Sequence, residues 1–543
     1  MIESKTINQK SGANGAADVK QIIGKKDFIN RRKLAKQIQP QTSTWKFSNR
    51  GIAVRLFLTC WIVFAVHFAT NTVREIYPAL SLAENFSFDV AEYAGIHPDI
   101  FTLKGRGTFI NNNPGASMMG AIPYFLARPV TDRIIERVQK ARAENPQSES
   151  ENYDTIYPMS QEFYRNAREK GFDVKFGLAA GLMQFFLMAP ISALSVVVMF
   201  FILLNLTQNA RPSVWLALLY AFATPVFYRT AQLNQNILLA HFALFSFALL
   251  WRPWATKDSE KKPFYFLAGL CVGWTVVLDY SGITAVLILS GYAVSRWLSF
   301  PKEKREIYNL MRFAAGVSIC AFILMAYQWT SFGNPILPAQ SYMPPVNYTE
   351  LGYRGFAFPS FDLLFQTAFN MRYGLFTSAP ILLLAFAVPI WTREKTRLLE
   401  KRELLFCAAF IGLFFIFCSA NQYGRMQFNT GVRHIVPVIP FLFLFAANVL
   451  LKLPRLAVVL IGLLATYWSW CLAMYRDVEQ GFGVFESIKH ITLEGFQLPW
   501  LKTLERMGFV HNTSVIPLFF LCGAIIWALW SVGAKRQNTE FSN

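Results

Sequence analysis

One acidic residue and an asparagine-rich turn lie together in the longest polar loop of the chain. Asp99 precedes a short polar hairpin (LKGRG). After the hairpin comes a turn formed by Asn111, Asn112, Asn113, Pro114 and Gly115. Such residues favour tight turns with exposed backbone N–H groups, and a helix that begins at such a turn can hold a phosphate. A carboxylate beside it suits a general base or a metal ligand. The alternative is a turn that only returns the chain to the membrane.

Two further acids in the same loop are candidates for the same chemistry. Glu75 and Asp89 lie upstream of Asp99, and each alone is typical of a solvated surface. The stretch ALSLAE between them has helical spacing, and Pro78 suits the first turn of a helix. We expect this helix to lie along the membrane surface and to hold the nearby acids at a fixed height.

Polar residues also mark the ends of later apolar segments. Ionisable groups at membrane depth usually face protein or a wet cavity, and they are functional candidates for that reason. The candidate substrate-binding residues are Tyr228, His241, Asp279, Arg425, Arg433 and His434. Arg425 and Arg433 fall on the side where the positive-inside rule disfavours arginine. A bound phosphate would explain them, and so would pairing with acids of the outer loops.

Composition indicates an integral membrane protein. The chain has 543 residues, of which 54% are hydrophobic and only 16% charged. Its net charge of +19 is concentrated in the first fifty residues and in short loops, for example around Lys302 and Arg397. This is the positive-inside pattern, so the charge indicates contact with anionic lipid and no nucleic-acid partner. The cysteines lie in apolar segments and show neither a disulfide framework nor metal-ligand spacing.

Runs of apolar residues predict an all-α polytopic protein with about 12 transmembrane helices. The predicted segments are 52–71, 176–205, 213–231, 236–251, 264–281, 282–300, 311–332, 374–391, 404–420, 434–451, 455–474 and 515–533. An even number puts both termini on one side, and the basic loops then all lie in the cytoplasm. The long loops, 72–175 and 333–373, lie outside.

The same pattern predicts the domain organisation. Residues 1–50 form a basic, disordered cytoplasmic tail, and 51–475 form the transmembrane core. The first outer loop, 72–175, carries interfacial helices, including the apolar patch 116–127 that Pro123 interrupts. It also carries a charged insertion at 131–160, which begins with a helix at 132 and runs into a polar linker. Residues 476–543 supply an outer loop, the last transmembrane helix and a short cytoplasmic end.

The order of these features resembles the GT-C superfamily of membrane glycosyltransferases. The nearest group comprises the bacterial relatives of protein O-mannosyltransferases and the aminoarabinose transferase of lipid A. The resemblance covers roughly residues 52–475 and is carried by REIYPALSLAE, FDVAEY, GRGTFINNNPGASMMGAIPYFL, VVLDYSGITAVLIL, YQWTSFGNPILPAQSY and NQYGRMQFNTGVRHIVPVIPFL. Members of the group carry an acid soon after the first span, often as an Asp-Glu pair, where this chain has Arg74 and Glu75.

The resemblance implies an enzyme of the cell envelope. It would transfer a sugar from a polyprenyl-phosphate donor to an acceptor glycan, lipid or protein on the non-cytoplasmic side of a bacterial inner or plasma membrane. The implied catalytic acid is Asp99, Glu75 or Asp89, and the sequence does not decide among them. It also leaves open whether a divalent cation takes part.

Two other functions remain open at this point. A lipid or glycan transporter of similar fold would need access from both sides and usually shows internal repeats, which are not evident here. A non-catalytic subunit of a membrane assembly would use the basic tail and the charged insertion for docking. Retention of activity without Asp99, or stable association with a partner, would favour the subunit.

Overall fold

The computed structural model describes residues 47–70, 73–144, 158–255, 262–345, 348–425, 430–475, 483–507, 509–511 and 513–532. Most of the tail predicted at 1–50, the linker part of the charged insertion and the C-terminal end therefore lie outside the described residues. The described part is mainly helical with very little strand, as predicted. Its two short strands, β1 (Ile100–Leu103) and β2 (Gly107–Ile110), form an antiparallel hairpin in the first outer loop.

Five helical segments are long and apolar enough to cross a membrane. They are α2 (Asn49–Val66), the continuous run Asp173–Thr207, α13 (Ile307–Phe332), α17 (Lys401–Ala420) and α19 (Arg455–Met474). The long run consists of α6 (Asp173–Met183), the π-helical turn η2 (Gln184–Met188) and α7 (Ala189–Thr207).

Five shorter apolar segments stand beside the long ones. They are α10 (Gln235–Trp251), α11 (Tyr265–Leu278), α12 (Gly282–Leu298), the pair η8 (Val436–Val438) and α18 (Ile439–Leu450), and α22 (Ile516–Ser531). Glycines allow close approach within this bundle, as is common between membrane helices. A Cβ on Gly273 of α11 would lie 2.9 Å from the Cα of Val317 in α13.

Two of the twelve predicted segments are broken into separate pieces rather than forming a continuous helical run, and a proline lies at each break. The segment 213–231 divides into α8 (Ala210–Phe222) and α9 (Val226–Thr230) around Pro225. The segment 374–391 divides into α15 (Leu375–Ser378), the 3₁₀ stretch η6 (Pro380–Phe386) and α16 (Val388–Thr392). Proline has no N–H to donate and disfavours helical geometry in the residue before it.

The first outer loop contains the helix expected at Pro78, α3 (Ile76–Asn85), followed by η1 (Ala91–Tyr93) and the hairpin. The patch 116–127 and the charged helix expected from 132 are one continuous helix, α4 (Gly115–Glu144). The helix continues through Pro123 and Pro129 because packing holds it together. Its buried residues Ala116, Gly120 and Tyr124 recur every fourth position and form one face.

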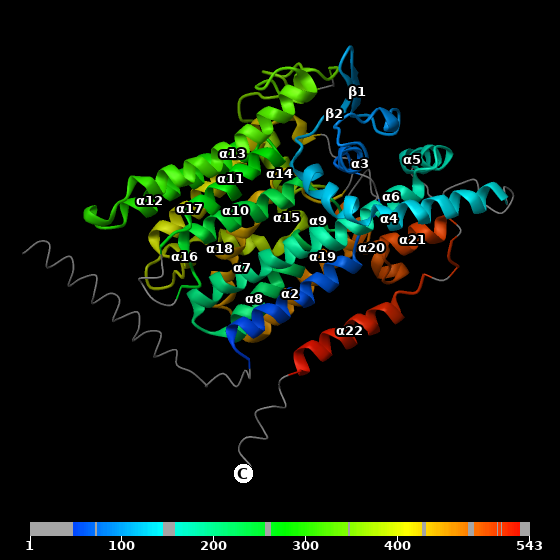
Figure 1. The fold of residues 1–543 in the computed structure, drawn as a ribbon. Helices are drawn as coiled ribbons and strands as arrows, with labels where there is room; N and C mark the ends of the chain where they lie inside the picture. The colour runs from blue at the N-terminus through cyan, green and yellow to red at the C-terminus, as the bar shows by residue number, and fades with distance from the viewer. Residues whose placement is uncertain are drawn as a thin grey trace, which may run out of the picture.

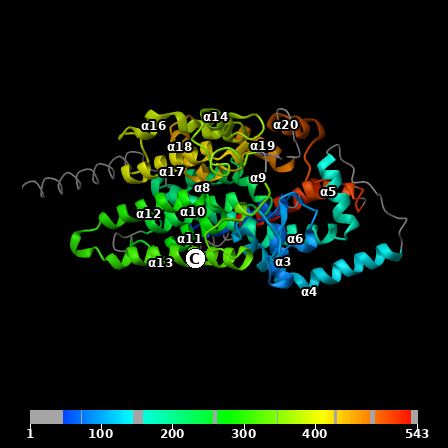
Figure 2. The ribbon, with the colours of Figure 1, turned by 90° about the horizontal axis from the view of Figure 1, so that it is seen from above.

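The shorter helices outside the apolar segments gather with this loop at one end of the bundle (Figure 1). They include α5 (Pro158–Glu169), α20 (Gly483–Glu494) and α21 (Pro499–Arg506). Figure 2 shows the same grouping from above, with α14 (Phe361–Phe369) close to α17 and α18. Short 3₁₀ turns complete the described elements: η4 (Lys302–Lys304), η5 (Ala339–Ser341) and η7 (Gln422–Arg425).

Candidate functional site

Arg74 lies between two carboxylates in the segment that leads into α3. Its Nε lies 3.6 Å from Glu75 Oε1, and its Nη1 donates a hydrogen bond of 3.4 Å to Asp99 Oδ2. The side chain of Asp99 is 27% exposed and that of Glu75 only 6%, so Asp99 is the more accessible acid. Burial acts to lower the pKa of Arg74, but the carboxylates of Glu75, Asp99 and Asp279 together raise it.

Asp279 joins this cluster from the end of α11. Its Oδ1 accepts the backbone N–H of Ser281, and its Oδ2 accepts a 2.7 Å hydrogen bond from the Gln235 side chain at the start of α10. Both contacts fix the carboxylate where two apolar helices meet. A third carboxylate, far from Glu75 and Asp99 in the sequence, is thereby brought within electrostatic range of Arg74.

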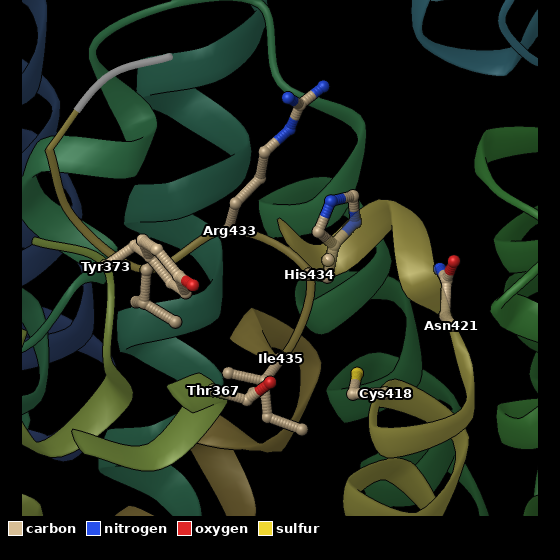
Figure 3. Close-up of a pocket in the computed structure, with 9 residues that line it drawn as sticks. Thr367, Tyr373, Cys418, Asn421, Arg433, His434 and Ile435 are labelled. Carbon is tan, nitrogen blue, oxygen red and sulfur yellow. The ribbon is translucent and has the colours of Figure 1, made fainter. Parts of the chain in front are cut away.

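Arg433 and His434 approach from the loop between α17 and α18. Figure 3 shows both side chains pointing to the same side of this loop, whereas Ile435 points the opposite way. They line a small, partly open pocket of about 10 Å³, which has room for roughly one water molecule, together with Thr367, Tyr373 and Asn421. Neither side chain forms a hydrogen bond or an ion pair with the described residues. Arg433 is therefore a guanidinium that remains available beside a pocket.

The charges around Arg433 show which groups surround it. Burial lowers its pKa, and the neighbouring cation of Arg74 lowers it further. Three carboxylates act in the opposite sense, those of Glu75, Asp99 and Asp279. The structure thus brings Asp99 and Arg433 into one region, although the two do not form a direct ion pair.

Arg229 holds the backbone of the segment that carries Arg433. The guanidinium of Arg229 is buried and donates hydrogen bonds to the carbonyl oxygens of Gly431, at 2.5 Å, and Val432. Gly431 has φ +96°, and a Cβ there would lie 2.9 Å from the ring of Tyr228, so this position requires glycine. The ring of Tyr228, which was predicted to bind substrate, therefore packs against Gly431 of this loop.

His97 completes the charged cluster on the side of the first outer loop. Its Nδ1 accepts the backbone N–H of Asp99 at 3.0 Å, and its ring meets that of Tyr77 edge-on at 5.8 Å. Burial lowers the pKa of His97 to about 4, and the cations of Arg74 and Arg433 lower it against the opposing effect of Asp99. The imidazole is therefore neutral at physiological pH and helps to fix the backbone of Asp99.

The asparagine-rich turn is fastened to the protein rather than open. Asn113 donates a 2.7 Å hydrogen bond to the carbonyl oxygen of Val276, and Asn111 contacts the sulfur of Met343 at 2.9 Å. Asn112 is buried. A Cβ on Gly115 would lie 2.7 Å from the carbonyl oxygen of Val277. In this structure these contacts, rather than a phosphate, account for the residue types in the turn. The turn also places the start of α4 against the end of α11.

Two other predicted site residues, Asp89 and His241, lie apart from the charged cluster. Asp89 Oδ1 accepts the backbone N–H groups of Ala91 and Thr108 and so ties the hairpin to the preceding loop. Its carboxylate is not among those that act on Arg74 or Arg433. His241 is completely buried between α10 and α7, with Nε2 2.9 Å from Ser192 Oγ.

Arg425 forms an ion pair with an acidic residue, which was the alternative to phosphate binding in the sequence analysis. Its Nη1 lies 2.8 Å from Oδ2 of Asp362, an exposed residue at the start of α14. Hydrogen bonds from Arg425 and Gln366 lower the pKa of this carboxyl group. Arg425 thus pairs with Asp362 of α14. Arg433 has no such acidic partner among the described residues.

Sequence reasoning did not assign site roles to Arg74, His97 or Arg229. Arg74 could have been found by the argument that singled out Arg433, because it also lies in a loop predicted to be outside. No sequence signal connects Arg229 with Val432, which lies 203 residues away. Within the described residues, no group of three His, Cys, Asp or Glu side chains could hold a metal ion.

Comparison with known proteins identifies no relative of this chain. No family model, curated protein or solved structure matches the chain. The fold and the site alone define a helical protein with segments suited to a membrane and a cluster of partly buried charges where its polar loops meet.

Proposed function

We propose that this protein is a membrane glycosyltransferase that takes a sugar from a polyprenyl-phosphate donor on the non-cytoplasmic side of the membrane. The observation that carries the proposal is the combination of Arg433, a cation without an ion-pair partner among the described residues, with the accessible carboxylate of Asp99 nearby. Arginine is well suited to bind the phosphate of such a donor.

The charge distribution supports separate roles for the two arginines. Arg74 is neutralised by Glu75 and Asp99, so it orients the carboxylates. Arg433 is half-buried and has no ion-pair partner among the described residues, so it can pair with one additional negative charge. A buried cation stabilises the charge that develops on a departing phosphate more strongly than an exposed one does.

The reaction would proceed by direct displacement. Asp99 takes the proton from an acceptor hydroxyl while that oxygen attacks the anomeric carbon of the donor sugar. The bond between the anomeric carbon and the phosphate oxygen breaks, and its electron pair leaves with the polyprenyl phosphate. The configuration at the anomeric carbon inverts. General-base assistance of this kind typically contributes about 10²–10⁴-fold.

The proposed membrane topology agrees with this mechanism. Twelve spans with both termini in the cytoplasm would place the first outer loop and the 421–433 loop on the same, outer side. The apolar helices beside the site would let a lipid-linked donor enter from the bilayer. The acceptor, a glycan, lipid or protein, would approach from the aqueous side near the more exposed Asp99.

The test measures sugar transfer from a radiolabelled polyprenyl-phospho-sugar by the purified protein in nanodiscs. Asp99→Asn should reduce transfer to background, with unchanged yield and thermal stability. Asp89→Asn is the matched control, because its Oδ1 still accepts the two backbone N–H groups, and it should remain active. Full activity of Asp99→Asn would overturn the role of this residue. Movement of intact donor across the bilayer without bond cleavage would indicate a transporter instead.

A further inference from the structure

A second and larger cavity lies between the end of α2 and the outer helices. It encloses about 410 Å³, is partly open, and is lined by residues of α4, α5, α6 and α21. The lining is almost entirely apolar and includes Phe68, Val138, Phe163, Phe176, Trp500 and Phe509. Small-molecule sites typically enclose about 300–1,000 Å³, so this cavity has the size of a binding site rather than of a packing defect.

The polar side chains that line the cavity all have hydrogen-bond partners. The carboxylate of Asp173 forms two hydrogen bonds with Arg142, of 2.9 and 2.7 Å, which neutralise its charge. The hydroxyl of Thr70 lies 2.6 Å from that of Thr503 and 3.1 Å from that of Tyr164. These three hydroxyls form a small uncharged polar patch in an otherwise apolar site. Such a lining favours a hydrocarbon chain that carries a neutral polar group.

The position of the cavity coincides with the ends of two candidate spans. Phe68 and Thr70 follow the last residue of α2, and the α6 residues belong to the first turns of the run Asp173–Thr207. The helix α4, which supplies Val138, exposes large apolar residues that would contact a membrane surface: Ile122, Phe125, Leu126, Val130 and Ile134. The cavity is therefore placed to receive a chain from the bilayer.

Aromatic packing separates this cavity from the charged cluster. Tyr77 is fully buried, and its ring contacts Phe176 of the cavity wall at 5.6 Å and His97 of the cluster at 5.8 Å. A chain whose phosphate lay at Arg433 would have to cross this wall to enter the cavity. The separation therefore argues against the chain of the proposed sugar donor as the occupant.

We propose that the cavity binds the acyl chain of a membrane phospholipid, with its ester group near the hydroxyls of Thr70, Thr503 and Tyr164. The bound chain holds α21 against α4, α5 and α6. Trp500 fastens α21 to the end of α2 through a 2.9 Å hydrogen bond to the Val66 carbonyl and by stacking on Phe68. The lipid would fill the remaining space among these helices.

Gly177 provides a direct way to block the cavity. It belongs to the lining, and a Cβ there would meet nothing within 4 Å, so a larger side chain can extend into the open space. Gly412 of α17 also has nothing within 4 Å of a Cβ but lies elsewhere, so Gly412→Phe is the matched control. Leu178→Trp is a second blocking variant if Gly177→Phe does not fold.

The full-length protein in nanodiscs is irradiated with a phospholipid that carries a photoactivatable group in its acyl chain, and labelled peptides are mapped. Wild type and Gly412→Phe should be labelled within 163–178 and 500–509, and Gly177→Phe several-fold less. Equal labelling of the Gly177→Phe variant would overturn the proposal. Labelling of these peptides only by a photoactivatable polyprenyl phosphate would overturn it as well. Asp99→Asn should be labelled like wild type, so the result does not depend on catalysis.

Discussion

The buried guanidinium of Arg229 donates a hydrogen bond to the backbone carbonyl of Val432, the residue that precedes Arg433. A second hydrogen bond reaches the carbonyl of Gly431. The backbone N–H of Val432 in turn donates to Ser378 Oγ at 3.2 Å. The loop that presents Arg433 is therefore fixed by a side chain from α9.

We expect Arg229→Lys to impair presentation of Arg433. Lysine keeps the charge but cannot bind both carbonyls with a planar fork. Hydrogen bonds to charged groups contribute about 1.5–3 kcal/mol, so kcat/KM should fall roughly 10- to 100-fold. The measurement is steady-state transfer with varied donor. An increase of KM for the donor, with a smaller change in kcat, supports positioning; a loss of folded protein with unchanged KM contradicts it.

Substitution of the two outer-loop arginines should give different results. Arg433→Gln removes the cation beside the pocket, and we expect donor turnover to fall about 10²–10³-fold. Arg425→Gln removes an ion pair with the exposed Asp362, and such pairs contribute little. We expect turnover within about threefold of wild type for that variant. Similar losses in both variants would contradict the distinct role of Arg433.

Gly115→Ala tests the contact between α4 and α11. The added Cβ would lie 2.7 Å from the Val277 carbonyl oxygen, so one of the two helices must shift. Overpacking of this kind destabilises by about 1–3 kcal/mol. Thermal unfolding in detergent should show a lower midpoint, and activity should fall with it. Gly523→Ala in α22 meets nothing within 4 Å and serves as the control.

The low pKa of His97 predicts that the folded protein loses stability as the pH falls. Its pKa is about 4 in the folded protein and near 6.5 when unfolded. As pH falls below 6.5, the unfolded state binds a proton that the folded state does not, so stability decreases until the pH reaches about 4. The decrease should be at most about 3 kcal/mol. Unfolding midpoints measured between pH 7.5 and 4.5 should fall less steeply in His97→Gln than in wild type; parallel curves would contradict this assignment.

Apolar runs in the sequence predict most of the helices well. The predicted segment 236–251 is α10 (Gln235–Trp251) almost residue for residue, because a long apolar run has few alternatives to a helix. The failures have local causes. Pro225 and Pro380 divide two predicted segments, whereas Pro123 does not divide α4, because packing against α3 and α6 maintains that helix.

The candidate site was only partly predictable. Arg433 and Asp279 were identifiable because ionisable groups near apolar helices need a reason to be there. Asp89 was a further candidate beside Asp99 in the sequence, and only the hydrogen bonds of its Oδ1 reveal its role in the hairpin. The pairing of Arg229 with Val432 depends on how distant segments pack, and periodicity and composition carry no information about it.

The start of α4 and the turn just before it are attached to the segments that supply Glu75 and Asp279. Ser117 Oγ donates to the backbone carbonyl of Glu75 at 2.8 Å, and Asn113 donates to Val276, three residues before Asp279. Local unfolding of this one turn would release both acids at once. The active arrangement should therefore be lost in a single cooperative step on heating, before the apolar bundle itself melts.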